Sequence, residues 1–241
     1  MTITENQTVR EIAVENPATV RVFESLGIDY CCGGRRPLTD ACAEANVPVE
    51  RLLEMLRSAG QGAPEDAQPW KDAPLAELAA HIVTRHHGYI RKETPRIEAL
   101  LEKVTMRHGS GHPELLTVKE LFAAMSQELL THAMKEEQVL FPHIERMEKA
   151  AVAGEPAPAA FFGSVRNPIA RMLADHDDAG ELTARIRKIT DNYRLPEGAC
   201  PTYRALFDGL AEFERDLHQH VHLENNILFP RAVQLENRGS N

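Results

Sequence analysis

Apolar residues recur at steps of three and four along most of the chain, and no convincing stretch alternates between apolar and polar positions as a half-buried strand does. The pattern predicts four long helices at about 74–104, 115–148, 166–191 and 201–233. Most connections between them are short, so neighbouring helices should run antiparallel. The sequence therefore predicts an all-α protein whose larger part is an up-down four-helix bundle.

A group of shorter helices is predicted ahead of these four. Thr8 is placed to cap a first helix, Pro17 opens a second helix, and Gly27 ends it. Two more helices begin near Thr39 and Pro48. A unit of this length has only a marginal hydrophobic core when it stands alone.

A polar stretch rich in proline and glycine, residues 59–74, separates the short helices from the long ones. Such a composition is typical of a linker between domains. We therefore expect a small helical domain at 1–62, a linker at 63–72 and the four-helix bundle at 73–236.

One motif occurs twice, in the second and in the fourth long helix. It begins at His132 and at His220, and both copies read H-x-x-x-E-[EN]-[QN]-[VI]-L-F-P. The offset is 220 − 132 = 88 residues, which indicates an internal duplication. The proline that closes each copy has no backbone N–H, so it should kink or end its helix near the preceding phenylalanine.

Histidines on the other two long helices fit the same repeat. His87 and His176 are 176 − 87 = 89 residues apart, within one residue of the offset of the motif. Each interrupts an apolar stripe on its helix, as His220 and Glu224 do on theirs. These polar side chains should therefore point into the core at about the same height.

Polar side chains that converge in a core need a reason to be there. Buried carboxylates without compensating positive charge are costly, and two that converge raise each other's pKa. A pair of metal ions supplies the charge, and the predicted ligands are His87, His132, Glu136, His176, His220 and Glu224. A single histidine on an apolar face is usually a hydrogen-bonded core residue, but the duplicated set favours a metal site. A ligand set of imidazoles and carboxylates suits iron or manganese, and the ligand types alone do not exclude zinc.

Other polar residues near the motif have two interpretations. Four acidic residues either orient the ligand imidazoles or are solvated charges: Glu128, Asp175, Asp177 and Asp216. Glu137 is rotated by about 100° from the inward face, so its removal should leave metal binding and stability unchanged. The remaining histidines are interpreted as surface or core residues: His81, His86, His108, His112, His143, His218 and His222.

Composition narrows the function classes. The net charge of −9 argues against the phosphate backbone of nucleic acid as a main partner. No apolar run is long enough to span a membrane. The first residues have neither a basic start nor an apolar stretch, so we expect no secretion signal and a cytoplasmic location.

Cys31 and Cys32 are adjacent and are followed by Gly33-Gly34 and Arg35-Arg36. Adjacent cysteines have poor geometry for a disulfide, and nearby arginines would favour the thiolate. We predict Cys31 and Cys32 as catalytic residues of a redox, nitric-oxide-reactive or iron-relaying dithiol. The alternative is two buried small residues in a small core. Cys42 and Cys200 lack such a context and are interpreted as structural.

The combination resembles a known family. The larger unit resembles the haemerythrin-like HHE cation-binding domain. The smaller unit, through Leu26-Gly-Ile-Asp-Tyr-Cys-Cys-Gly-Gly34, resembles the N-terminal domain of the di-iron proteins of iron–sulfur cluster repair, the RIC family of YtfE and ScdA type. The resemblance implies a haemerythrin-like bundle that holds two iron ions, oxo- or hydroxo-bridged, on the six predicted ligands.

The resemblance also implies a function and partners. It implies repair of iron–sulfur proteins damaged by nitric oxide or oxidants, by donation of iron or by reduction of nitric oxide to nitrous oxide. Its partners would be the damaged proteins, nitric oxide or oxygen, and a second copy in a homodimer. The alternative is a non-catalytic sensor or carrier of oxygen, nitric oxide or iron. A carrier would not need the two cysteines, so Cys31 and Cys32 favour repair.

Overall fold

The computed structural model describes residues 3–59 and 70–239. In these two ranges the regular elements are all helical, and the single β-bridge joins Thr8 and Pro37. The prediction of an all-α protein is therefore confirmed. Most of the predicted linker, residues 63–69, lies outside the described residues.

The chain divides into two compact units. The first comprises residues 1–74 together with 218–231, and the second comprises 75–217 together with 232–241. The predicted domain limits, 1–62 and 73–236, stay a prediction. The segment His218–Arg231 belongs to the first unit although it continues a long helix.

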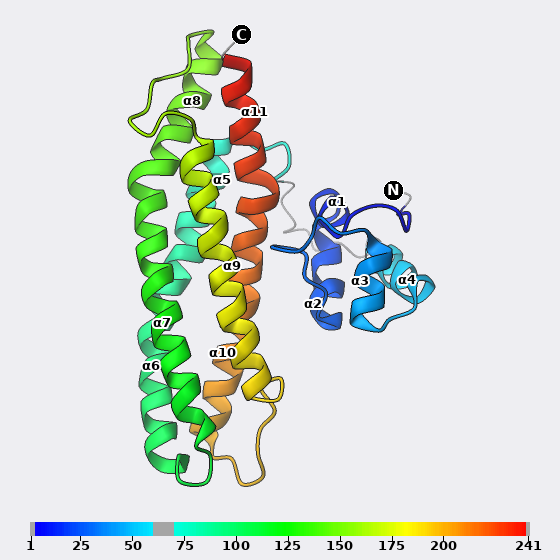
Figure 1. Cartoon of the computed structure of the whole chain (residues 1–241), viewed down its shortest axis with the longest axis vertical. Helices are drawn as coiled ribbons and strands as arrows, with labels where there is room; N and C mark the ends of the chain where they lie inside the picture. The colour runs from blue at the N-terminus through cyan, green and yellow to red at the C-terminus, as the bar shows by residue number, and fades with distance from the viewer. Residues whose placement is uncertain (1–2, 60–69, 240–241) are drawn as a thin grey trace. The chain divides into compact units, whose positions relative to one another are not determined.

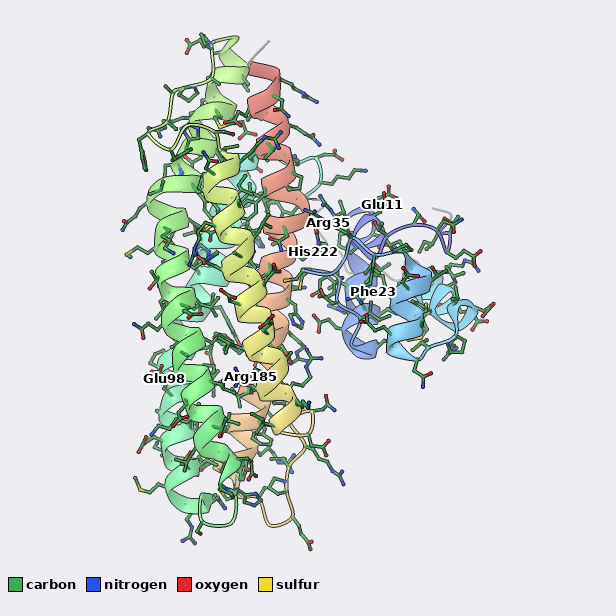
Figure 2. All side chains as sticks on the ribbon, viewed as in Figure 1. Glu11, Phe23, Arg35, Glu98, Arg185 and His222 are labelled. Carbon is green, nitrogen blue, oxygen red and sulfur yellow. The ribbon has the colours of Figure 1, made fainter. Side chains whose placement is uncertain are left out.

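Short helices make up most of the first unit, and they are α1 (Val9–Glu15), η1 (Pro17–Thr19), α2 (Val20–Leu26), α3 (Leu38–Ala45) and α4 (Val49–Ala59). Thr8 and Glu11 form a capping box, because each side chain bonds the backbone N–H of the other residue. Gly27 ends α2 with a φ of 66°, a left-handed conformation that glycine adopts without strain. Phe23 of α2, labelled in Figure 2, is fully buried.

Long helices make up the rest of the chain, which is the second unit together with the segment His218–Arg231, and α6, α7, α9 and α10 lie side by side in Figure 1. In chain order the elements are α5 (Leu75–Ile82), η2 (Val83–His87), α6 (Gly88–His108), α7 (Glu114–Lys135), η3 (Glu136–Leu140), α8 (Phe141–Ala153), α9 (Arg166–Ile189), α10 (Pro201–Leu223), η4 (Glu224–Leu228) and α11 (Phe229–Gly239). The four predicted helices are all present. Their predicted apolar stripes face inward, as the burial of Ile97, Leu101 and Ile186 shows.

The helices do not end at the motif prolines. A π-helical turn, η3 or η4, precedes each proline, and the chain continues as α8 or α11. An α-helical bond from residue 230 would end on the carbonyl of Asn226, but Pro230 has no N–H. Arg10 donates to that carbonyl at 3.2 Å, within the first unit. The π turn and this outside donor accommodate Pro230 without a break.

Candidate metal centre

The six predicted ligands are all buried, with at most 2% of any of them exposed. Their ligand atoms form two groups, and within each group these atoms lie within 4.8 Å of one another. The first group is His87, Glu136, His220 and Glu224; the second is His132, Glu136, His176 and Glu224. Both glutamates belong to both groups, so the structure brings together every residue that the duplicated pattern predicted.

The distances inside the groups are short. Glu136 Oε2 lies 3.3 Å from His87 Nε2 and 3.2 Å from His132 Nε2. His132 Nε2 and His176 Nε2 are 3.1 Å apart. His220 Nε2 and Glu224 Oε1 are 2.9 Å apart. Two ligands on one ion, each with a bond of about 2.1 Å, would stand roughly 3 Å apart, so these spacings fit shared metal ions.

The chemistry of the donor set also fits a metal. Each group offers two imidazole nitrogens and two carboxylates, a set that suits iron and does not exclude zinc. Two buried carboxylates without a positive charge beside them would strongly destabilise the folded protein. Bound cations remove that cost. Glu136 and Glu224 are the only residues common to the two groups. Each of these two carboxylates can therefore contribute to either group.

Two of the predicted ligand histidines have a carboxylate at their outer nitrogen. His87 Nδ1 lies 2.7 Å from Glu137 Oε1, and Arg91 donates to the same oxygen at 2.5 Å. His132 Nδ1 lies 3.4 Å from Asp175 Oδ2. Burial alone would raise the pKa of Glu137, but the hydrogen bonds from Arg91 and His87 outweigh it and lower that pKa. The pKa of Asp175 is lowered in the same way, against burial, chiefly by the bond to His132.

These contacts revise several expectations about the neighbouring residues. The side chain of Glu137 reaches back to His87 on another helix, which argues against the expectation that its removal has no effect. Asp175 meets a ligand histidine, which favours the first of its two interpretations. Glu128 and Asp177 are exposed, as solvated charges would be. Asp216 contacts His86 at 3.1 Å, and His86 belongs to neither ligand group.

The two adjacent cysteines lie on a turn organised by Asp29. Its carboxylate accepts hydrogen bonds from the backbone N–H groups of Cys31, Cys32 and Gly33, at 2.9, 3.0 and 2.8 Å. The two sulfur atoms are 3.9 Å apart, and Cys31 is buried while Cys32 is partly exposed. The hydrogen bond to Cys32, burial and the charge of Asp29 raise the pKa of Cys31 well above its ordinary value.

The expectation that the arginines favour a thiolate at Cys31 is therefore wrong. Arg36 pairs with the carboxylates of Glu44 and Asp29 and donates to the Gly33 carbonyl. Its guanidinium group holds the turn, and the Cys31 sulfur lies 3.4 Å from the carboxylate of Asp29. The sequence showed the arginines but could not show which acidic groups they meet.

The cysteine turn also contacts the segment that carries two predicted ligands, again within the first unit. Asn226 donates its side-chain amide to the carbonyl of Tyr30 at 2.9 Å and lies 2.9 Å from His222 Nδ1. Burial lowers the pKa of His222 to about 4. Tyr30, directly before Cys31, donates its hydroxyl to Glu24 at 2.7 Å. His222 was interpreted only as a surface or core histidine, and it is a buried one.

The remaining cysteines differ from each other. Cys42 is buried, as a structural residue would be. Cys200 directly precedes α10, and its sulfur lies 3.2 Å from His108 Nε2. Backbone hydrogen bonds, first that of Tyr203, lower the pKa of Cys200. Its position ahead of Pro201, a favoured first residue of a helix, was the available signal in the sequence.

Among the described residues, no helix combines the length and the apolar character needed to cross a membrane.

Comparison with known proteins gives consistent matches over both units. Residues 78–232 match the haemerythrin HHE cation binding domain, and residues 5–60 match a domain of unknown function, DUF542. Two relatives are the proteins called iron-sulfur cluster repair protein YtfE in Pectobacterium carotovorum subsp. carotovorum (strain PC1) and in Yersinia pseudotuberculosis serotype IB (strain PB1/+). Each is 36% identical over 231 residues, which cover 96% of this chain and 98% of the relative.

Proposed function

This chain belongs to the YtfE family of iron–sulfur cluster repair proteins, and from that membership we propose that it repairs iron–sulfur clusters damaged by nitrosative or oxidative stress. The main support for this proposal is the two ligand groups that share Glu136 and Glu224, because together they could bind a pair of metal ions. Its partners would then be damaged iron–sulfur proteins, with nitric oxide or oxygen as the small ligand. The predicted cytoplasmic location fits such partners.

The ligand groups support a specific assignment of the ions. His87 and His220 would hold one iron, His132 and His176 the other, and the two glutamates would bridge them. Four imidazoles and two carboxylates supply up to eight donor atoms, which leaves positions for a small ligand on two six-coordinate ions. When bound, the pair supplies redox-active iron that takes up small ligands and that can be donated to a client cluster. An oxo or hydroxo bridge is part of the proposal.

The residues of the chain act on this centre by holding and shielding it. The imidazoles point Nε2 inward, and the complete burial of Glu136 and Glu224 excludes bulk water from the carboxylates. Low local polarity strengthens the attraction between carboxylate and cation. The cysteine turn would supply the thiol chemistry of repair: the partly exposed Cys32 would react first, and Cys31 would respond as its neighbour.

The alternative is a sensor or carrier that binds a small ligand without turnover. The match of the relatives over both units, including the unit with Cys31 and Cys32, favours repair over that alternative. Consumption of nitric oxide separates the two functions. An enzyme that reduces nitric oxide to nitrous oxide consumes many equivalents per chain when an electron donor is present, whereas a carrier stops at the number of its sites.

The decisive experiment measures iron content, the optical spectrum and the restoration of a nitric-oxide-damaged iron–sulfur enzyme. We expect about two iron atoms per chain and near-ultraviolet bands of a bridged ferric pair. The protein should also restore more of the damaged enzyme's activity than free iron does. The variant Cys31→Ser/Cys32→Ser should keep iron and spectrum but lose restoration, with Cys42→Ser as the control. One tightly held zinc without iron, in protein made with ample iron, would refute the di-iron assignment. The predicted homodimer is tested on the same samples by light scattering.

A further inference from the structure

Each pair of proposed ligand histidines contains one whose outer nitrogen meets a second carboxylate. His87 Nδ1 lies 2.7 Å from Glu137 Oε1, and His132 Nδ1 lies 3.4 Å from Asp175 Oδ2. On the opposite side of each ring, Nε2 lies 3.3 Å or 3.2 Å from Oε2 of Glu136. Each imidazole thus connects a fully buried carboxylate to one nearer the surface.

Basic side chains hold each outer carboxylate in place. Arg91 donates at 2.5 Å to the oxygen of Glu137 that meets the histidine. Arg171 Nε lies 2.9 Å from Asp175 Oδ1, and Lys135 Nζ lies 3.4 Å from Asp175 Oδ2. The same three-part order, imidazole then carboxylate then cation, therefore occurs in both halves of the centre.

The two arrangements are built from different sequence positions, so the duplication does not explain them. Glu137 directly follows the ligand Glu136, but the residue that directly follows Glu224 is Asn225, which carries no carboxylate. Asp175 comes from α9 and directly precedes the ligand His176. Two unrelated solutions give the same contact, which indicates a requirement of the site rather than a by-product of the repeat.

We propose that Glu137 and Asp175 are positioning residues, one for each half of the metal centre, an inference that rests on the proposed di-metal function. Neither residue belongs to a ligand group. Each accepts the Nδ1–H of its histidine and so fixes the tautomer in which the Nε2 lone pair faces the metal position. The carboxylate also makes the imidazole a more basic ligand. Arg91 and Arg171 act through these carboxylates, by holding them toward the histidines.

The test uses variants that keep the shape of the side chain and remove its charge, Glu137→Gln and Asp175→Asn. Iron release to a ferrous chelator is followed in each, beside the melting temperature of the metal-free and metal-loaded protein. We expect affinity for about one of the two ions to fall roughly 10- to 100-fold in each variant. Release should therefore become biphasic, while the metal-free melting temperature stays that of the wild type.

Matched controls lie on α9 itself and on α7, the helix that directly precedes η3. Glu128→Gln on α7 and Asp178→Asn on α9 change exposed acidic residues and should release both ions as the wild type does. Arg91→Met should weaken the same ion as Glu137→Gln, but less, because the carboxylate remains. Rescue by Glu137→Asp should be partial, since the shorter chain reaches less far.

The outcomes separate the possible roles. Release kinetics in Glu137→Gln and Asp175→Asn equal to those of the controls would overturn the proposal. A lower melting temperature without metal, combined with unchanged release, would also overturn it, because that result marks a merely structural role. A wild-type protein that binds no metal would instead refute the proposed function itself, and only the wild-type measurement reports that failure.

Discussion

Glu136 and Glu224 are the residues on which the candidate centre depends most. Each belongs to both ligand groups, and both side chains are fully buried. A buried carboxylate is unfavourable without positive charge and becomes favourable with bound metal. The same side chain therefore has opposite effects on stability in the metal-free and metal-loaded states.

Replacement of either glutamate by alanine should expose this change of sign. Glu136→Ala and Glu224→Ala should each lose both ions, because each removes a donor from both groups. Without metal, each variant should melt at or above the temperature of the metal-free wild type. Metal analysis and calorimetry of both states check this. Retention of two ions in either variant would contradict the shared role, and Glu128→Ala serves as the exposed control.

The environments of the cysteines favour different protonation states of their thiol groups. The hydrogen bond with Cys32, burial and the charge of Asp29 favour the protonated form of Cys31, whereas backbone N–H groups favour the thiolate of Cys200. A thiol with a lowered pKa has a larger thiolate fraction near pH 7, and one with a raised pKa has a smaller fraction. The thiolate is the form that alkylating reagents attack.

Alkylation by iodoacetamide near pH 7 should therefore follow this order. Cys200 should be modified before the buried Cys31 and Cys42, and modification of Cys31 should speed up only as the pH rises above the ordinary range of a thiol. Peptide mapping by mass spectrometry at several times and pH values measures the order. Modification of Cys31 ahead of Cys200 at neutral pH would contradict the assigned environments.

At the scale of elements, three of the six predicted ligands lie in irregular helical turns. His87 ends the π-helical turn η2, while Glu136 and Glu224 begin η3 and η4. A π turn inserts one residue into the helical repeat and changes the direction of the side chains around it. Such turns are frequent at functional sites. The motif prolines follow η3 and η4, where the regular hydrogen-bond pattern is already interrupted.

The Asn226 carbonyl, which Pro230 leaves without an α-helical donor, gives a prediction for Arg10. Arg10→Met removes the donor to the Asn226 carbonyl and should lower the free energy of unfolding by about 1 kcal/mol, because water compensates in part at this half-buried site. Denaturant titration measures the change. Arg35→Met is the control, since Arg35 is exposed. Equal effects of the two substitutions would remove the special role of this bond.

At the scale of the whole molecule, the proposed ions would connect segments far apart in the sequence. The ligands extend from His87 to Glu224 and come from α7, α9 and α10 as well as from the π-helical turns. Bound metal then stabilises the folded chain by mass action, because the unfolded chain does not hold the six ligands together.

Removal of metal by a chelator should therefore destabilise the entire fold. Metal present at about 1,000 times its dissociation constant contributes about 4 kcal/mol. For a chain of this size that corresponds to a melting temperature higher by about 8–16 °C. Calorimetry before chelation, after chelation and after iron is restored tests the effect. An unchanged melting temperature, with metal loss confirmed by analysis, would show that the site contributes nothing to stability.

The sequence alone was enough to predict the helices and the six buried side chains that the structure brings together. A helix places residues three and four apart on one face, so the stripes and their polar interruptions at His132 and Glu136 could be assigned from spacing. The duplication supplied the second copy, and the matching offset of His87 and His176 supplied the rest. These features depend on local periodicity, which the order of residues records directly.

Only the tertiary structure decided which residues meet across helices. Three findings join side chains whose separation in the chain follows no helical period. Glu136 and Glu224 belong to two groups, Glu137 contacts His87, and Arg36 pairs with carboxylates. The removal of Glu137 was expected to have no effect, because its position on the helix faces away from the core. A long side chain can nevertheless reach back to a neighbouring helix, and helix packing, not helical periodicity, determines that reach.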